Sequence, residues 1–143
     1  MKLRILFFLA MIGLLSSCDP RKDPCASVDA PLAGTTFMLV DSSTGESLIG
    51  SNRVYDPDSL NFLNGFFPFR ISKEQDTIVS FQFGTVSNGE ILEFNLDENE
   101  IDTIQIEYDI RKTECFDIKD LKRFFYNGEL IEPNDRQLHV IKK

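Results

Sequence analysis

Few residues of this sequence have the types needed for catalysis. The chain has one histidine, His139, so a Ser-His-Asp or Cys-His site would have to use it as the base. The sequence contains no Gly-x-Ser-x-Gly turn that would present a serine nucleophile. His139 also falls in a short apolar stretch close to the carboxyl end. We therefore expect His139 to be a surface residue with no catalytic role.

Acidic residues are abundant, and residues 97–102 gather four carboxylates and one amide. Calcium prefers such oxygen ligands, but this stretch lacks the glycine and the spacing of an EF-hand loop. Zinc is disfavoured because one histidine and two spare cysteines 90 positions apart supply no close ligand pair. No opposed carboxylate pair of the kind that a glycosidase needs can be singled out. We expect a solvated acidic turn, no metal and no cofactor.

The first 18 residues have the layout of an export signal. Lys2 and Arg4 give a positive start, residues 5–15 form an apolar run, and two serines lead to Cys18. A run of 11 residues is too short to remain as a membrane-spanning helix, which needs about 20. We predict that residues 1–17 are a secretory signal peptide that is removed from the mature protein.

Leu15-Ser16-Ser17-Cys18 resembles the lipobox of bacterial lipoproteins, which has leucine, two small residues and then the modified cysteine. The resemblance implies that the Cys18 thiol receives a diacylglycerol, that the chain is cut before it, and that the new amino group is acylated. Two or more acyl chains anchor a protein stably, whereas one binds reversibly. We expect a lipid-anchored protein of the bacterial cell envelope, at the outer membrane, with the periplasmic and the surface face both open.

Cys25 and Cys115 remain once Cys18 is assigned to lipid. An even pair of cysteines in an oxidising compartment favours a disulfide between them. The alternative of two unrelated thiols stays open, because a disulfide requires proximity in space that the sequence does not give.

The negative net charge of the chain disfavours nucleic acid as a partner. Removal of residues 1–17 leaves 126 residues, which suits one domain. It also removes two basic residues and no acidic residue, so the formal net charge changes from −8 to −10. Such a domain repels DNA, RNA and anionic lipid head groups. We therefore expect membrane contact through the lipid on Cys18.

The mature chain divides into a tether and a domain. Residues 18–34 hold three prolines and few large apolar side chains, as is typical of a spacer between bilayer and domain. Residues 35–143 alternate apolar and polar residues, most clearly from Ile104 to Ile110, which predicts half-buried strands. Further strands are predicted at residues 37–40, 60–63, 66–71, 79–83, 92–96 and 138–141, with Pro68 placing one of them at a sheet edge.

Two stretches near the carboxyl end give opposite signals. Asn127-Gly128 is the strongest hairpin signal, since both residues accept the positive φ angles of a type I′ turn. Residues 117–125 instead place Ile118, Leu121 and Phe124 at helical spacing, with Asp117 as an N-cap. A short helix or turn is expected there.

About seven to nine short strands predict an all-β fold, an antiparallel β-sandwich of Ig-like or transthyretin-like type, with a small β-barrel as the alternative. Residues 40–50, Val-Asp-Ser-Ser-Thr-Gly-Glu-Ser-Leu-Ile-Gly, are similar to the first hairpin of the carboxypeptidase-regulatory-like, transthyretin-like family. The resemblance implies a second strand beginning at residues 53–55. The sequence before residue 40 lacks that family's Gly-x-Val opening. The resemblance bears on the fold and not on activity.

Two classes of function fit these features, and neither is an enzyme. One is a non-catalytic accessory module that binds an envelope protein or glycan, with loops of the sandwich as the expected contact surface. The other is an inhibitor of a basic enzyme such as lysozyme, which an acidic domain would suit. The family of lipoprotein lysozyme inhibitors is similar in size, anchor and β content, but its Tyr-x-Cys motif is absent here.

Overall fold

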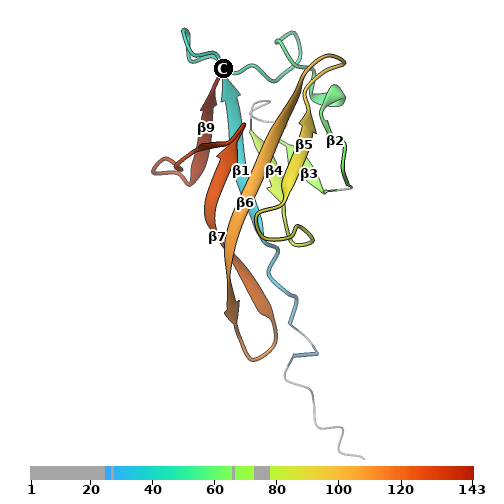
Figure 1. The fold of residues 1–143 in the computed structure, drawn as a ribbon, viewed down its shortest axis with the longest axis vertical. Helices are drawn as coiled ribbons and strands as arrows, with labels where there is room; N and C mark the ends of the chain where they lie inside the picture. Colours follow the sequence, from blue (N-terminus) through green and yellow to red (C-terminus); the bar gives the residue numbers. More distant parts are fainter. Residues whose placement is uncertain (1–24, 27, 66, 73–77) are drawn as a thin grey trace, which may run out of the picture.

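The computed structural model describes residues 25, 26, 28–65, 67–72 and 78–143. These residues form two stacked β-sheets of four and five strands (Figure 1). The predicted all-β sandwich is confirmed, and the barrel alternative is wrong because the two sheets are not closed on each other. The predicted signal peptide, Cys18 and the first part of the tether lie outside the described residues.

The first sheet has the strand order β3-β4-β1-β9. Its strands are β1 (Gly34–Val40), β3 (Phe69–Ile71), β4 (Val79–Gln82) and β9 (Leu138–Lys142). β3 lies at the edge, as Pro68 predicts. β1 pairs with β4 antiparallel but with β9 in parallel, with Thr36 opposite Leu138. The sandwich is therefore antiparallel as expected except at this one pairing of its named strands.

The second sheet has the order β2-β5-β6-β7-β8. Its strands are β2 (Asn61–Phe62), β5 (Ile91–Asn95), β6 (Ile101–Lys112), β7 (Asp117–Tyr126) and β8 (Glu129–Leu130). The predicted alternation along β6 is confirmed, because Ile104 and Ile106 are fully buried. Ile110 is 56% exposed, since the β6–β7 hairpin extends beyond the other strands at that end (Figure 1).

Phenylalanines from both sheets fill the space between them. The ring of Phe37 on β1 lies 5.7 Å from that of Phe94 on β5 and 5.8 Å from that of Phe124 on β7. All three side chains are at most 1% exposed. Burial of one such ring contributes about 2 kcal/mol, so these contacts between the layers hold the sandwich together.

β7 corrects the expectation of a helix or turn at residues 117–125, because the segment is a strand paired along β6. The pairing shifts register between Glu107 and Tyr108, so that Lys122 is an extra residue on β7. A bulge of this kind turns a spacing of two into a spacing of three. Leu121 and Phe124 therefore both face inward although they are three residues apart, which produced the helical pattern.

The turns after β7 and after β1 behave differently from each other. Asn127 has φ of 49° and Gly128 has φ of 80°, so the predicted positive-φ hairpin turn between β7 and β8 is confirmed. After β1, Val40 pairs with Ser47 across a turn. The expected strand at residues 53–55 is wrong: Tyr55 makes only an isolated bridge, to Ile49, before the 3-10 helix η1 (Pro57–Ser59).

Candidate functional site

A groove of about 650 Å³ opens on the surface of the described part of the chain. It is lined by β1, β3, β4 and β9 of the first sheet, by β7 and β8 of the second, and by the segment that leads from β8 to β9. Buried rings of Phe81 and Phe124 contribute to its surface. Leu32 and Leu130 flank it with 77% and 46% of their surface exposed. The groove therefore combines an apolar interior with apolar side chains left open to solvent.

One side of the groove is an open edge of β7. β8 pairs only with Phe125 and Tyr126, so β7 has no neighbouring described strand from Asp117 to Phe124 on that side. The carbonyl of Phe124 accepts a hydrogen bond from the N–H of Ile131 at 2.9 Å, just beyond the end of β8. Leu121, further along β7, lines the groove beyond that point.

The other side of the groove is an open edge of β1. β9 begins opposite Thr36, so Gly34 and Thr35 extend past it. Ala33 accepts a hydrogen bond from Phe83 N–H at 2.9 Å, which directs the backbone groups of Ala33 toward β4 and, by alternation, those of Gly34 away from it. Two sheet edges without a strand partner among the described residues therefore border one groove.

His139 lies in the wall of this groove, and the expectation that it is a surface residue is wrong. Its side chain is 3% exposed and packs against Phe124, with ring centroids 4.5 Å apart. Nδ1 lies 2.8 Å from the carbonyl oxygen of Ile131, so this nitrogen carries the hydrogen and donates it. Burial lowers the pKa of His139, and the bond to Ile131 offsets this only in part. The neutral ring keeps Nε2 as an acceptor.

Charged residues around the groove are mostly cations. Lys122 lies 3.3 Å from Asp109 and Arg123 pairs with Glu107, and all four side chains are partly or largely exposed. Arg70 on β3 also lines the groove and makes no ion pair in the described part of the chain. Glu132 is the acidic residue of the lining. Three of the four charged residues that line the groove are thus cationic, but Lys122 and Arg123 are paired with Asp109 and Glu107, which leaves Arg70 as the cation without an acidic partner among the described residues.

Arg70 also begins a polar row that crosses the first sheet. Ser80 lies directly opposite Arg70 on one side and opposite Thr36 on the other. The Thr36 hydroxyl continues the row by donating to the carbonyl of Gln137 at 3.3 Å. Cross-strand neighbours are about 5 Å apart, so the row presents a guanidinium and two hydroxyls at regular spacing beside the groove.

A second polar cluster lies at the opposite end of β6 from the hairpin. Lys143 bridges the carboxylates of Glu100 and Asp102. Asp102 is 6% exposed and accepts further hydrogen bonds from the Tyr126 hydroxyl at 2.5 Å and from the Asn127 amide at 2.8 Å. Each acceptor atom of this buried carboxylate is therefore satisfied, as a buried charge requires.

The pKa values in this cluster move away from neutrality. Burial alone would raise the pKa of Asp102, but hydrogen bonds from Lys143, Tyr126 and Asn127 outweigh it and hold the pKa below its usual range. Burial would lower the pKa of Lys143, yet its two carboxylate partners raise it. Burial and the bond to Asp102 raise the pKa of Tyr126. Each group is thus fixed in one protonation state at pH 7, which suits a structural ion pair and not a proton-transfer site.

The same cluster corrects the expectation of a solvated acidic turn at residues 97–102. Asp97 caps the turn by accepting the N–H of Asn99 at 2.7 Å. Glu100 and Asp102 instead face Lys143, and Glu100 also accepts the Tyr55 hydroxyl at 2.8 Å. No group of three histidine, cysteine or acidic side chains placed to hold a metal ion occurs among the described residues.

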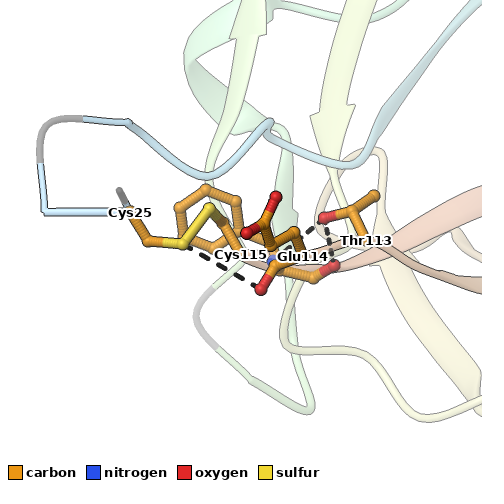
Figure 2. Close-up of a disulfide and its surroundings, with 5 residues drawn as sticks. Cys25, Thr113, Glu114 and Cys115 are labelled. Atoms are coloured by element: carbon orange, nitrogen blue, oxygen red, sulfur yellow. Dashed lines mark hydrogen bonds between the residues drawn. A yellow bond between two sulfur atoms is a disulfide. The ribbon is translucent and has the colours of Figure 1, made fainter. Parts of the chain in front are cut away.

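Cys25 and Cys115 form a disulfide, with 5.3 Å between their Cα atoms, as the sequence favoured (Figure 2). Cys115 sits in the turn of the β6–β7 hairpin, where Thr113 Oγ1 donates to the carbonyl of Phe116 at 2.7 Å. The bridge ties the tether to this hairpin, 90 positions further along the chain. Residues 28–33 then run from the hairpin end to the start of β1 (Figure 1).

Sequence reasoning missed the groove, Arg70 and Lys143. For His139 a signal existed, because it shares strand parity with the apolar Ile141, and both prove to be 3% exposed. For Arg70 and Lys143 no sequence signal was present, since their neighbours are remote along the chain.

Two further findings bear on identity. No helix in the described residues is long and apolar enough to cross a membrane. Comparison of the chain with models of protein families, with curated proteins and with solved structures finds no match.

Proposed function

We propose that this protein is a lipid-anchored, non-catalytic binding module of the bacterial envelope, and that it holds its partner in the groove between the open edges of β1 and β7. The observation that carries the proposal is this groove of about 650 Å³. Binding sites commonly combine an apolar hollow with a few polar groups that fix orientation. Here the polar groups are the row from Arg70 to Thr36 and the imidazole of His139.

The titratable groups support binding over catalysis. A hydrolytic site needs a nucleophile with its base, a metal, or two carboxylates with separated pKa values. Nδ1 of His139 donates its hydrogen to the carbonyl of Ile131, and no hydroxyl or thiol of the described residues forms a hydrogen bond with the ring. The carboxylate of Asp102 is held ionised by Lys143. Neither group is poised to exchange a proton near pH 7.

The disulfide supports a defined orientation on the membrane. If Cys18 carries the lipid, Cys25 lies seven positions after it, and a fully extended chain of that length spans about 25 Å. Because Cys25 is bridged to Cys115, the short segment from Cys18 to Cys25, called the leash below, attaches to the β6–β7 hairpin and not to the start of β1. The hairpin end then faces the bilayer, and the opposite end of the sandwich faces away from it.

The alternative of an inhibitor for a basic enzyme draws on the acidic net charge and on the similarity in size, anchor and β content to the lipoprotein lysozyme inhibitors. The groove lining holds one acidic residue, Glu132, beside three basic ones, so it offers no acidic surface to a basic enzyme, and a partner that enters the groove is the better-supported reading.

Photo-crosslinking in intact cells tests the proposal. A crosslinking amino acid replaces Leu130, which flanks the groove, or Ile91, which is 57% exposed on β5 and does not line it. We expect one discrete product from position 130 and none of that mass from position 91. The proposal fails if neither position captures a partner and the purified protein turns over a peptidoglycan, glycan or ester substrate with activity that a single acidic substitution abolishes.

A further inference from the structure

We propose that the groove takes an extended acidic polypeptide segment, which adds as a strand along the open edge of β7. This inference rests on the proposed binding function and specifies the chemical class of the partner. It is carried by three observations: the direction of the backbone groups at the groove, the exposed apolar side chains beside it, and an arginine in its lining, Arg70, that has no acidic partner among the described residues.

The backbone of β7 offers hydrogen-bonding groups to the groove. Tyr108 lies opposite Leu121 but gives its N–H to the Asn88 side chain at 2.9 Å, so it donates away from β7. Tyr108 and Leu121 therefore form a non-hydrogen-bonded pair, and the N–H and C=O of Leu121 point away from β6. They point to the side where β8 has already ended.

Across the groove, the backbone of Gly34 is directed away from β4 and has no β9 residue opposite it. An extended chain satisfies such edges because its own N–H and C=O groups alternate at the same spacing. A glycan has no matching repeat of donors and acceptors. The groove lining also contains no tyrosine or tryptophan on which a sugar ring could stack.

Apolar side chains are placed to cover alternate residues of an added strand. Leu32 and Leu130 flank the groove in exposed positions, while Phe69, Leu121 and Ile131 line it in half-buried positions. A strand carries its side chains alternately to two faces. One face of the added segment would therefore lie on these residues, and the other would point to solvent or to the charged residues around the groove.

The guanidinium of Arg70 favours a carboxylate on the added segment. Lys122 and Arg123 are already paired with Asp109 and Glu107, whereas Arg70 has no acidic partner in the described residues. A carboxylate binds a guanidinium through two parallel hydrogen bonds. Ser80, directly opposite Arg70, supplies a hydroxyl group beside it, and Thr36 follows on the next strand.

Selection from a random heptapeptide library tests the inference. The target is the full mature chain, purified from membranes of the producing cells in detergent. We expect the recovered peptides to be enriched in Asp and Glu and to alternate them with Val, Ile or Thr. Synthetic versions should bind the parent protein at least tenfold more tightly than the Arg70→Glu variant. The matched control is Lys112→Glu, which makes the same change of charge sign at an exposed residue outside the groove and should leave binding unchanged.

A second measurement separates a strand from a mere acidic ligand. In an added strand, every second N–H of the peptide donates to β7 and the others point away. N-methylation of the odd-numbered nitrogens and of the even-numbered nitrogens is therefore compared, and one of the two sets should weaken binding at least tenfold. The inference is overturned if N-methylated peptides bind as tightly as unmethylated ones, or if Arg70→Glu binds the peptides as the parent protein does. It is also overturned if an acidic polysaccharide competes as well as the peptide, or if sedimentation shows that a second copy of the chain fills the groove. If crosslinking from position 130 still yields a discrete partner in those cases, the binding function stands and the partner class is wrong.

Discussion

The hydroxyl of Tyr126 lies 2.5 Å from Oδ2 of Asp102, and the ammonium of Lys143 contacts the same carboxylate oxygen. These three residues come from β7, β6 and the residue that follows β9, so the contact joins the two sheets at the end away from the hairpin. The carboxylate is 6% exposed. These two partners, together with the Asn127 amide, decide whether a buried charge at this place stabilises the protein or destabilises it.

Lys143→Met should lower the free energy of unfolding by about 3 kcal/mol, because it leaves the Asp102 carboxylate buried without a cation. Urea denaturation monitored by tyrosine fluorescence measures the change. Lys142→Met alters an exposed lysine beside it and should change stability by less than about 0.5 kcal/mol. Equal effects of the two substitutions would show that the cluster is not a structural ion pair.

Acid should destabilise the protein through the same carboxylate. The pKa of Asp102 is lowered in the folded state, so its contribution is present above the unfolded pKa of about 3.9 and is lost as pH falls through the folded pKa. In Lys143→Met the pKa of Asp102 should rise, and the loss of stability below pH 4 should shrink. Unfolding curves of the two proteins between pH 5 and pH 2.5 make the comparison, and parallel profiles would contradict it.

His139 should titrate below the usual histidine range and stay neutral at pH 7, because burial disfavours its charged form. It is the only histidine, so its ring signals in an NMR titration are unambiguous. Since the unfolded chain binds the proton at a higher pH, stability should fall as pH drops through about 6.5 toward the folded pKa. His139→Gln should remove that dependence. A pKa at or above 6.5, or a tautomer protonated on Nε2, would refute this account of the ring.

Cys25→Ser should lower the melting temperature modestly. Loop-entropy models give about 4–5 kcal/mol for a crosslink spanning 90 positions. The loss should be smaller, because Cys25 lies in the tether and the core does not depend on it. Cys115→Ser removes the same bridge and should give the same melting temperature. Titration of two free thiols in the unfolded, non-reduced mature protein would show that the bridge does not form.

The position of a spacer in the tether should matter because of this bridge. Ten Gly/Ser residues inserted between Pro24 and Cys25 lengthen the leash, whereas the same spacer between Ala30 and Pro31 lies after the bridge and leaves it unchanged. We expect only the first insertion to reduce quenching of a dye at position 112 by quenchers in the lipid head groups. After reduction of the disulfide, both insertions should reduce it. Equal effects before reduction would contradict the leash.

Much of the sheet could be predicted because alternation is local. Ile104 and Ile106 reveal a strand through their immediate neighbours, and Asn127-Gly128 reveal a turn through their own φ preferences. β7 was missed because one bulged residue, Lys122, breaks the period of two. The bulge depends on the pairing with β6, and a single sequence does not contain that information.

The candidate site could not be predicted, for a different reason. The groove exists where β8 stops short on β7 and where β9 starts late on β1, so it is a property of strand lengths and pairing. The pairing of Lys143 with Asp102 likewise arises from the parallel association of β9 with β1, which brings residues 41 positions apart into contact. Of the long-range contacts, the one between Cys25 and Cys115 could be predicted, because two cysteines left after Cys18 allow a single disulfide pairing.

The lipid anchor on Cys18 is the claim on which orientation, leash and compartment all depend, and metabolic labelling with a radioactive fatty acid tests it most directly. Cells producing the parent protein or the Cys18→Ala variant are labelled, and the immunoprecipitated protein is examined for radioactivity and for mass. The account predicts label on the parent protein, a mature chain beginning at Cys18, and no label on Cys18→Ala. Label that persists on Cys18→Ala, or an unlabelled parent protein that is exported and released, would contradict it.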